Sequence, residues 1–172
     1  SRAVKDMSEG EILQMRKSRK LDIDNETYYE IIRKKTASLI ATSMAIGAAS
    51  VTKNDEIVEK MFRIGLDAGI AFQIKDDIFD YQSKGLLGKP TGNDIKEKKI
   101  TLPLLYILNN CDSGERSRIL NLIKKKNKNQ AKVKELVDLV VSRGGLEYAS
   151  KVMNEFREKA INGIMEFPES DA

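Results

Sequence analysis

Apolar side chains recur at helical spacing through most of the chain. Clear examples are residues 100–108 and 133–141, where apolar positions return every three or four residues. No stretch shows the alternating pattern of a half-buried strand. N-capping residues ahead of acids predict helix starts near Asp24, Asn54 and Asp112, and Gly144-Gly145 predicts a break before a last helix over about 146–165. The pattern therefore predicts an all-α fold.

The stretch from about residue 24 to 50 predicts one long helix that changes character halfway along. Residues 26–35 mix charged and apolar side chains, whereas residues 37–49 are uncharged and mostly small. Tight helix packing is the favoured interpretation of the small residues, and room for a hydrocarbon chain is the alternative. A membrane span needs about 20 predominantly apolar residues; this run is shorter and carries hydroxyls, so we expect no integral membrane segment.

Three carboxylates lie within an otherwise apolar helical run over residues 69–81. Asp76, Asp77 and Asp80 fall, with Gln73, within about one third of the circumference of a helix. Clustered carboxylates raise one another's pKa unless a cation compensates, and their oxygens suit Mg²⁺. A calcium-binding EF-hand loop is excluded because Tyr81 stands where it requires glycine. The spacing predicts a magnesium site, with a solvated helix face as the alternative.

A glycine-punctuated segment comes next, over residues 85–94, and is not expected to be helical. Lys96, Lys98 and Lys99 come directly after it. Lysine ammonium groups bind phosphate oxygens as point charges, so lysines beside a magnesium site predict a diphosphate clamp. A basic surface loop is the alternative interpretation.

At this point the sequence resembles the trans-isoprenyl diphosphate synthases, or polyprenyl synthetases. The segments FQIKDDIFDY and GKPTGNDIKEKKITLP resemble the second aspartate-rich motif of that family and the loop after it. Upstream, Ser8-Glu9-Gly10-Glu11, Tyr28 and Lys35-Thr36 resemble further family signatures. The resemblance implies a helical bundle of the isoprenoid synthase type that condenses an allylic diphosphate with isopentenyl diphosphate.

The resemblance also assigns roles to individual residues. It implies that Asp76 binds Mg²⁺ directly and that Asp77 and Asp80 complete the metal site directly or through water. It also implies that three lysines hold the allylic diphosphate, namely Lys35, Lys89 and Lys99. The oxygens of Thr36 and Gln73 are expected to face the allylic cation, and Asp94 is expected to order the lysine loop. Lys35, Thr36 and Gln73 are the expected catalytic group. One departure is that the family commonly has glycine where this chain has Lys98.

The first aspartate-rich motif of the family, with its neighbouring arginines, is absent from these residues. We therefore expect residues 1–172 to be a single helical segment, the C-terminal part of a synthase domain trimmed at both ends, with no prenyl transfer of its own. The alternative is a non-catalytic helical partner subunit of a prenyl synthase. The resemblance implies a homodimer for the full-length protein and leaves the length of the product open.

Charge and composition bear on nucleic-acid binding, on the proton acceptor and on the cellular location. The chain has 30 basic and 26 acidic residues and no histidine, so its net charge is only +4. This near balance is not typical of nucleic-acid binding, and the run Lys124–Asn129 is interpreted as a solvated connection between helices. The expected proton acceptor is the departing diphosphate or a nearby base, and the lack of histidine in this segment fits the diphosphate. A single Cys111 and no apparent secretory segment predict a cytoplasmic protein.

Overall fold

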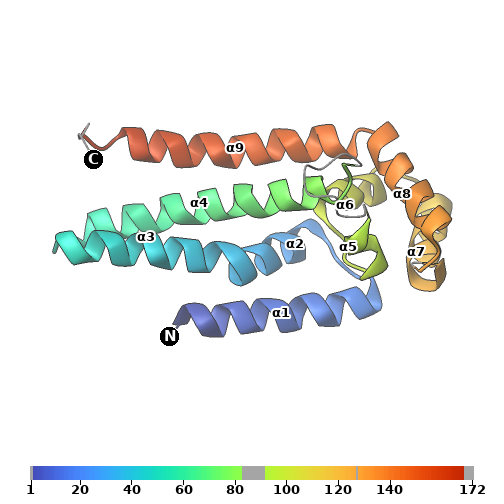
Figure 1. Cartoon of the computed structure of the whole chain (residues 1–172), viewed down its shortest axis with the longest axis horizontal. Coiled ribbons are helices and arrows are strands. Elements are labelled where there is room, and N and C mark those ends of the chain that lie inside the picture. The colour runs from blue at the N-terminus through green and yellow to red at the C-terminus, as the bar shows by residue number, and fades with distance from the viewer. Residues whose placement is uncertain (1, 83–91, 127, 169–172) are drawn as a thin grey trace. The chain divides into compact units, whose positions relative to one another are not determined.

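The computed structural model describes residues 2–82, 92–126 and 128–168, and every regular element in these ranges is a helix (Figure 1). The all-α prediction is confirmed. The predicted non-helical segment 85–94 lies largely outside the described residues, and its last two residues begin a short helix. The elements are α1 (Arg2–Lys20), α2 (Asn25–Ile32), the π-helical turn η1 (Arg33–Ala37), α3 (Ser38–Val51), α4 (Asp55–Phe79), α5 (Asn93–Lys96), α6 (Leu102–Asn109), α7 (Ser113–Lys126), α8 (Gln130–Ser142) and α9 (Gly145–Met165).

Capping side chains start three of these helices where the sequence predicts. In each case a side-chain oxygen accepts a hydrogen bond from a backbone N–H in the first turn, which would otherwise have no partner inside the helix. The bonds run from Thr27 to Asp24 (2.7 Å), from Glu56 to Asn54 (2.9 Å) and from Glu115 to Asp112 (2.8 Å). The break before α9 is also confirmed, since Gly144 has a φ of +80°.

One prediction about a long helix is confirmed with a local change, and one about a connection is wrong. The stretch predicted as a helix over about 24–50 is helical without a break from residue 25 to 51, and the π-helical turn η1 lies within it between α2 and α3. The lysine run that begins at Lys124 is not simply a connection, because α7 continues to Lys126. Lysines suit this position since the carbonyl end of a helix favours positive charge.

The chain divides into two compact units. The first comprises Ser1–Ile12, Tyr29–Gln73 and Val152–Ala172, and the second comprises Leu13–Tyr28 and Ile74–Lys151. Helices α1, α2, α4 and α9 each contribute residues to both units. The expectation of a single helical segment stays a prediction.

Small residues bring the helices of the first unit together. Figure 1 shows α3, α4 and α9 lying side by side. A Cβ atom added at Gly65 or Gly69 of α4 would lie 2.5 Å from the Cα of Ala41 or Ala37. Both alanines are fully buried. The small-residue stretch 37–49 therefore packs tightly at these two positions, as predicted.

The second unit has a core of large aliphatic side chains around α6, α7 and α8. Helix α8 packs against both α6 and α7. The largest fully buried side chains are Ile74, Ile78, Ile95, Leu102, Leu104, Leu105, Leu108, Ile119, Ile123, Val133, Leu136 and Val140. Ile74 and Ile78 belong to the end of α4, so the same turns of helix that carry the acidic motif also anchor it in this core.

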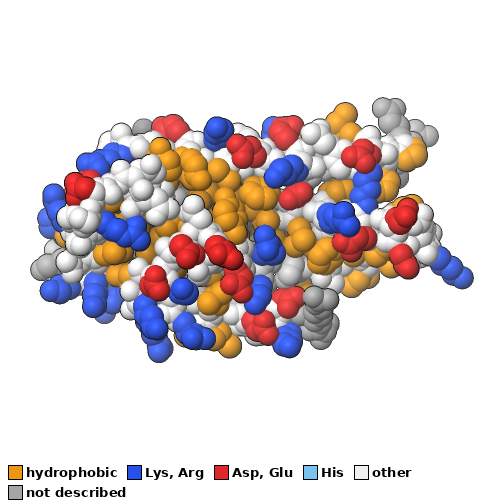
Figure 2. Space-filling model, turned by 180° about the vertical axis from the view of Figure 1, so that it is seen from behind, with side chains coloured by type: hydrophobic (Ala, Val, Ile, Leu, Met, Phe, Trp, Pro, Cys, Tyr) orange, Lys and Arg blue, Asp and Glu red, His pale blue; other side chains and the backbone are white. Residues whose placement is uncertain are grey.

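Charged side chains of both signs are intermixed on the face shown in Figure 2. Elsewhere in the described residues, ion pairs join side chains one helical turn apart, such as Arg63 with Glu59 and Lys134 with Asp138. Exposed pairs of this kind contribute only about 0–1 kcal/mol each. They keep the surface polar without deciding the fold.

Candidate functional site

The predicted site residues fall into two groups that belong to different units. Lys35, Thr36 and Gln73 lie in the first unit, while Asp76, Asp77, Asp80, Asp94 and Lys99 lie in the second. Lys89 lies outside the described residues. The joining of the two groups into one site remains a prediction.

The two residues of the Lys-Thr signature lie in the π-helical turn η1. The backbone N–H of Ser38 donates to the carbonyl of Arg33, five residues earlier, rather than to the carbonyl four residues earlier. The hydroxyl of Ser38 donates to the carbonyl of Lys34 at 2.8 Å. Such turns are rare in helices and are frequent at functional sites. Sequence reasoning identifies the two residues but misses this local geometry.

Thr36 and Gln73 are joined directly. The Thr36 hydroxyl donates to Oε1 of Gln73 at 2.7 Å, which fixes the orientation of both side chains. The Lys35 ammonium lies 2.8 Å from a carboxylate oxygen of Glu11 on α1. The structure thus brings the two oxygen-bearing residues of the predicted catalytic group together and holds the lysine with a counter-ion.

A hollow of about 500 Å³ opens beside this group in the first unit. It is lined by Met7, Ser8, Glu11, Ile12, Lys35 and Thr36. Its walls therefore combine two apolar side chains, one hydroxyl and one carboxylate from α1 with one ammonium and one hydroxyl from η1. This mixture suits a ligand with an apolar body and an anionic end.

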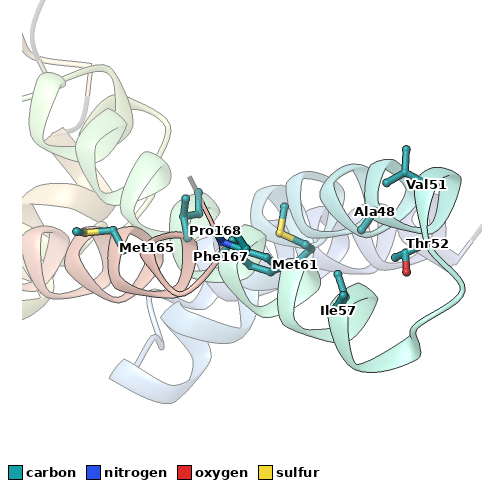
Figure 3. Close-up of a pocket in the computed structure, with 9 residues that line it drawn as sticks. Ala48, Val51, Thr52, Ile57, Met61, Met165, Phe167 and Pro168 are labelled. Atoms are coloured by element: carbon teal, nitrogen blue, oxygen red, sulfur yellow. The ribbon is translucent and has the colours of Figure 1, made fainter. Parts of the chain in front are cut away.

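A second, larger hollow of about 700 Å³ lies elsewhere in the first unit (Figure 3). It is lined mainly by apolar side chains, including Val51 at the end of α3 and Met61, Phe167 and Pro168. Val51 comes fifteen residues after Thr36, or about 23 Å along a helix axis. This hollow contains none of the predicted site residues.

The three acids of the aspartate-rich motif occupy three different environments. The sequence predicts one face of clustered oxygens, but Asp77 is only 4% exposed and points into the core. Its Oδ2 accepts hydrogen bonds from the Tyr28 hydroxyl at 2.7 Å and from the Leu102 N–H at 3.4 Å. Asp76, by contrast, is exposed. The burial of Asp77 favours a positioning role, and metal ligation by it stays a prediction.

Asp80 links the end of α4 to the start of α5. Its two carboxylate oxygens accept hydrogen bonds from the backbone N–H groups of Asn93 and Asp94, each at 3.0 Å. The backbone carbonyl of Asp80 accepts a third bond, from Gly92 at 2.8 Å. Asp80 therefore satisfies N–H groups in the first turn of α5, as an N-cap does. The sequence gives no signal for this contact because the partners are more than ten residues apart.

Burial and neighbouring charges perturb the acids around α5. Burial raises the pKa of Asp80, and the hydrogen bonds from Asp94 and Asn93 oppose this shift. Burial also raises the pKa of Asp94, and the negative charge of Asp80 raises it further. Asp76 contributes in the same direction to both. The three carboxylates are therefore close enough to repel one another, although Asp76 and Asp80 remain open to a cation.

Lys99 is held against the same acids. Its ammonium lies 3.5 Å from Asp94 and also pairs with Glu97. Burial alone would lower the pKa of Lys99, but the contacts with Glu97 and Asp94 outweigh it and the net pKa is raised. Lys98 has a φ of 60°, a left-handed conformation that favours glycine. This explains why glycine suits that position, where this chain departs from the pattern it resembles.

Most of the chain matches one known protein family. A family model described as polyprenyl synthetase matches residues 1–140. The chain belongs to the polyprenyl synthetase family. It is 31% identical to the geranylgeranyl diphosphate synthase of Saccharolobus solfataricus over 98% of this chain and 51% of that protein. It is 33% identical to the chloroplastic solanesyl diphosphate synthase 2 of Arabidopsis thaliana over 99% of this chain and 40% of that protein.

Solved structures of family members agree with this assignment. A geranylgeranyl pyrophosphate synthase from Bacteroides thetaiotaomicron has a TM-score of 0.89 at 37% identity, covering 99% of this chain and 56% of that one. A polyprenyl synthase from Caulobacter crescentus, in complex with calcium and isoprenyl diphosphate, has a TM-score of 0.88 at 31% identity, covering 99% and 52%. The chain spans about half the length of the relatives it matches.

Two properties of the described residues bear on cofactor and location. Within residues 2–82, 92–126 and 128–168, no three acidic, cysteine or histidine side chains form a group that could hold a metal ion. None of the described helices is both long enough and apolar enough to cross a membrane.

Proposed function

We propose that the full-length protein is a trans-isoprenyl diphosphate synthase that condenses an allylic diphosphate with isopentenyl diphosphate into a longer polyprenyl diphosphate. The observation that carries this proposal is the contact between Thr36 and Gln73, directly beside Lys35 and an apolar-walled hollow. Family membership and the names of the relatives support the same reaction. A similar structure in complex with isoprenyl diphosphate and calcium shows that one family member binds such ligands with a divalent cation.

We also propose Mg²⁺ as the cofactor, because the donors around the end of α4 fit it. Asp76 offers an exposed carboxylate, and each oxygen of Asp80 uses only one lone pair for its backbone partner. Carboxylate oxygens with room for water are the ligands that Mg²⁺ prefers. Burial raises the pKa of Asp80, and repulsion from Asp76 adds to it, so a bound cation would relieve this repulsion. When bound, Mg²⁺ neutralises charge on the departing diphosphate.

The lysines of this chain bind the diphosphate group in the proposed mechanism. Lys35 exchanges its contact with Glu11 for a phosphate oxygen, and Lys99 does the same with Glu97. Lys89 is the third expected contact. Because each ammonium is already paired with a carboxylate, Lys35 and Lys99 are held in place before the substrate arrives. Their charge stabilises the diphosphate as its bond to the allylic carbon breaks.

Thr36 and Gln73 act on the other side of that bond. The Thr36 hydroxyl donates its hydrogen bond to Gln73, so the lone pairs on the Thr36 oxygen point away from Gln73. These lone pairs form the negative end of a fixed dipole that stabilises the allylic cation. Met7 and Ile12 in the wall of the hollow help exclude water, which would otherwise capture the cation. The proton released after condensation passes to the departing diphosphate or to a nearby base, and residues 1–172 contain no histidine to serve as that base.

The test is a prenyl-transfer assay on the full-length protein with labelled isopentenyl diphosphate and a series of allylic diphosphates. The variant is Lys35→Gln and the matched control is Lys34→Gln. Lys34 lies in the same π-helical turn with a similar side-chain exposure, 34% against 31%, and pairs with Glu9 and Glu30. A hydrogen bond to a charged group contributes about 1.5–3 kcal/mol, so Lys35→Gln should weaken use of the allylic substrate by about 10- to 100-fold.

Two outcomes would overturn the proposal. Equal losses in both lysine variants would show that Lys35 has no special role. No product with any allylic diphosphate would exclude a synthase and leave the partner-subunit alternative. Because residues 1–172 contain only one aspartate-rich motif, we expect no turnover from them alone. From the family resemblance and the single cysteine we also propose a cytoplasmic homodimer, which sedimentation and fractionation of the full-length protein would test.

A further inference from the structure

We infer that Gly10 and Ser38 are positioning residues that hold the π-helical turn η1 and thereby aim Lys35 and Thr36. This inference rests on the proposed function, since it concerns how the same site is built. The two residues act from different elements, Gly10 from α1 and Ser38 from the first turn of α3. Neither of them lines the hollow beside Lys35.

Gly10 lets α1 touch the backbone of the turn. A Cβ atom added at Gly10 would lie 2.8 Å from the backbone nitrogen of Lys35 and 3.0 Å from the Cβ of Lys34. The first of these contacts is with backbone, which cannot swing aside as the end of a side chain can. Any larger residue at position 10 therefore has to push α1 and η1 apart.

The acids on either side of Gly10 hold the two lysines of the turn. Glu9 pairs with Lys34 at 3.3 Å, and Glu11 pairs with Lys35 at 2.8 Å. Consecutive residues of a helix point in directions about 100° apart, so the two lysines leave the turn on different sides. The two ion pairs lie on either side of the close contact at Gly10. Because their side chains are 31–49% exposed, each pair contributes little, so the backbone contact at Gly10 is the main constraint that α1 places on η1.

Ser38 satisfies the backbone group that a π-helical turn leaves over. In an α-helix the N–H of Ser38 would donate to the carbonyl of Lys34, four residues earlier. Here that N–H donates to the carbonyl of Arg33 instead. The Ser38 hydroxyl donates to the Lys34 carbonyl at 2.8 Å, and Ser38 is only 7% exposed. In this part-buried contact the hydroxyl takes the place of the N–H that the carbonyl would have in an α-helical turn, and it thereby stabilises the π-helical form.

The π-helical form matters because it sets the direction of Thr36. One extra residue in a turn rotates the rest of the helix by about 100° relative to a regular α-helix. Relaxation of η1 to α-helical geometry would therefore rotate the residues before the turn relative to α3, and Lys35 and Thr36 lie within the segment that takes up this rotation. Ala37 is held against Gly69 of α4, so the displacement falls on Lys35 and Thr36. The 2.7 Å hydrogen bond from Thr36 to Gln73 would then be lost.

The experiment compares Gly10→Ala and Ser38→Ala with two controls in the full-length protein. Gly47→Ala is the matched glycine control, because a Cβ atom at Gly47 meets nothing within 4 Å. Ser38→Thr is the matched hydroxyl control. Hydrogen exchange of residues 33–38 reports on the turn itself, and titration with inorganic pyrophosphate in Mg²⁺ reports on the site. Far-UV circular dichroism confirms that each variant is folded.

We expect Gly10→Ala and Ser38→Ala to speed exchange in residues 33–38 by about tenfold. They should weaken pyrophosphate binding by about 10- to 100-fold, as a misplacement near 1 Å does. Gly47→Ala should bind pyrophosphate as the parent does and should not speed exchange in residues 33–38, and Ser38→Thr should restore most of the binding that Ser38→Ala loses. If Gly10→Ala does not fold, the two Ser38 variants decide the question by themselves.

Unchanged exchange in both variants would overturn the inference, and so would faster exchange with unchanged pyrophosphate binding. Equal binding by Ser38→Ala and Ser38→Thr would also count against it. A parent protein that binds no pyrophosphate would overturn the proposed function as well as the role of the turn in it. The binding of the parent therefore separates failure of the function from failure of the positioning role alone.

Discussion

The neighbouring acids Asp76 and Asp77 should respond in opposite ways to replacement by alanine. Asp77 is 4% exposed and accepts hydrogen bonds from Tyr28 and from the backbone N–H of Leu102. Asp76 is exposed on the same helix. We expect Asp77→Ala to lower the free energy of unfolding and to leave the metal-dependent chemistry of the folded protein largely intact. Asp76→Ala should leave the free energy of unfolding almost unchanged and should weaken the metal-dependent binding of diphosphate.

The size of the Asp77 effect can be worked out from its contacts. Hydrogen bonds to charged groups contribute about 1.5–3 kcal/mol each, and a buried group left without a partner loses about 1–3 kcal/mol. The Tyr28 bond is short at 2.7 Å and its donor is 4% exposed, whereas the bond from Leu102 is long at 3.4 Å. We therefore expect Asp77→Ala to destabilise by about 3 kcal/mol. Asp76→Ala should change stability by no more than about 0.5 kcal/mol, as surface substitutions do.

Urea denaturation followed by circular dichroism measures both free energies. A double-mutant cycle of Asp77→Ala with Tyr28→Phe should give a coupling of about 1–2 kcal/mol, because the two side chains are in direct contact. Titration with pyrophosphate in Mg²⁺ measures the second property, and Asp76→Ala should weaken binding by about tenfold or more. The reasoning is refuted if Asp77→Ala is as stable as the parent, or if both substitutions weaken binding equally in folded protein.

Three further predictions concern packing, backbone strain and pH. Gly69→Ala places a Cβ atom 2.5 Å from the Cα of Ala37 and should destabilise by about 1–3 kcal/mol, whereas Gly47→Ala should stabilise by about 1 kcal/mol; thermal denaturation of both tests this contrast. Lys98→Gly should raise the free energy of unfolding by about 1 kcal/mol, because Lys98 has a φ of 60°; an unchanged urea midpoint would contradict it. Burial raises the pKa of Asp67, so its contribution to stability is present below its unfolded pKa and is lost as pH rises through its folded pKa. Asp67→Asn should therefore stabilise the protein at pH 7 and have no such effect near pH 3, which denaturation at the two pH values checks.

Local chemistry made part of this structure predictable from sequence. Asp24, Asn54 and Asp112 cap helices within a few residues of themselves, so the signal and its consequence lie in the same short window. The acidic motif is also visible at once, because three carboxylates in an apolar run are unusual. Its position on a long helix can be predicted from sequence alone.

The environments of those acids depend on partners far along the chain. Tyr28 lies 49 residues before Asp77, and the N–H groups that bind Asp80 lie more than ten residues after it. Periodicity places all three carboxylates within one third of a helix, yet it cannot say which edge of that sector faces the core. Only the packing of α4 decides that Asp77 is buried and Asp76 is not.

The π-helical turn is missed for a related reason. An apolar pattern with a period near 3.6 residues tolerates one extra residue without a visible break, and residues 33–37 contain no proline or glycine that would mark an interruption. The cause lies outside the segment, in Gly10 on another helix and in the hydroxyl of Ser38. Serine inside a predicted helix is common enough to pass unnoticed.

The close contacts of Gly65 with Ala41 and of Gly69 with Ala37 set how α4 is aligned along η1 and α3. Gly69 lies four residues before Gln73, and its partner Ala37 lies directly after Thr36. A slip of α4 by one turn, about 5.4 Å, would bring Gly65 opposite Ala37 and carry Gln73 out of reach of Thr36. The alignment of the helices is thus determined at the points where they are in contact. The close contacts at Gly65 and Gly69 therefore keep Thr36 and Gln73 within hydrogen-bond distance of each other.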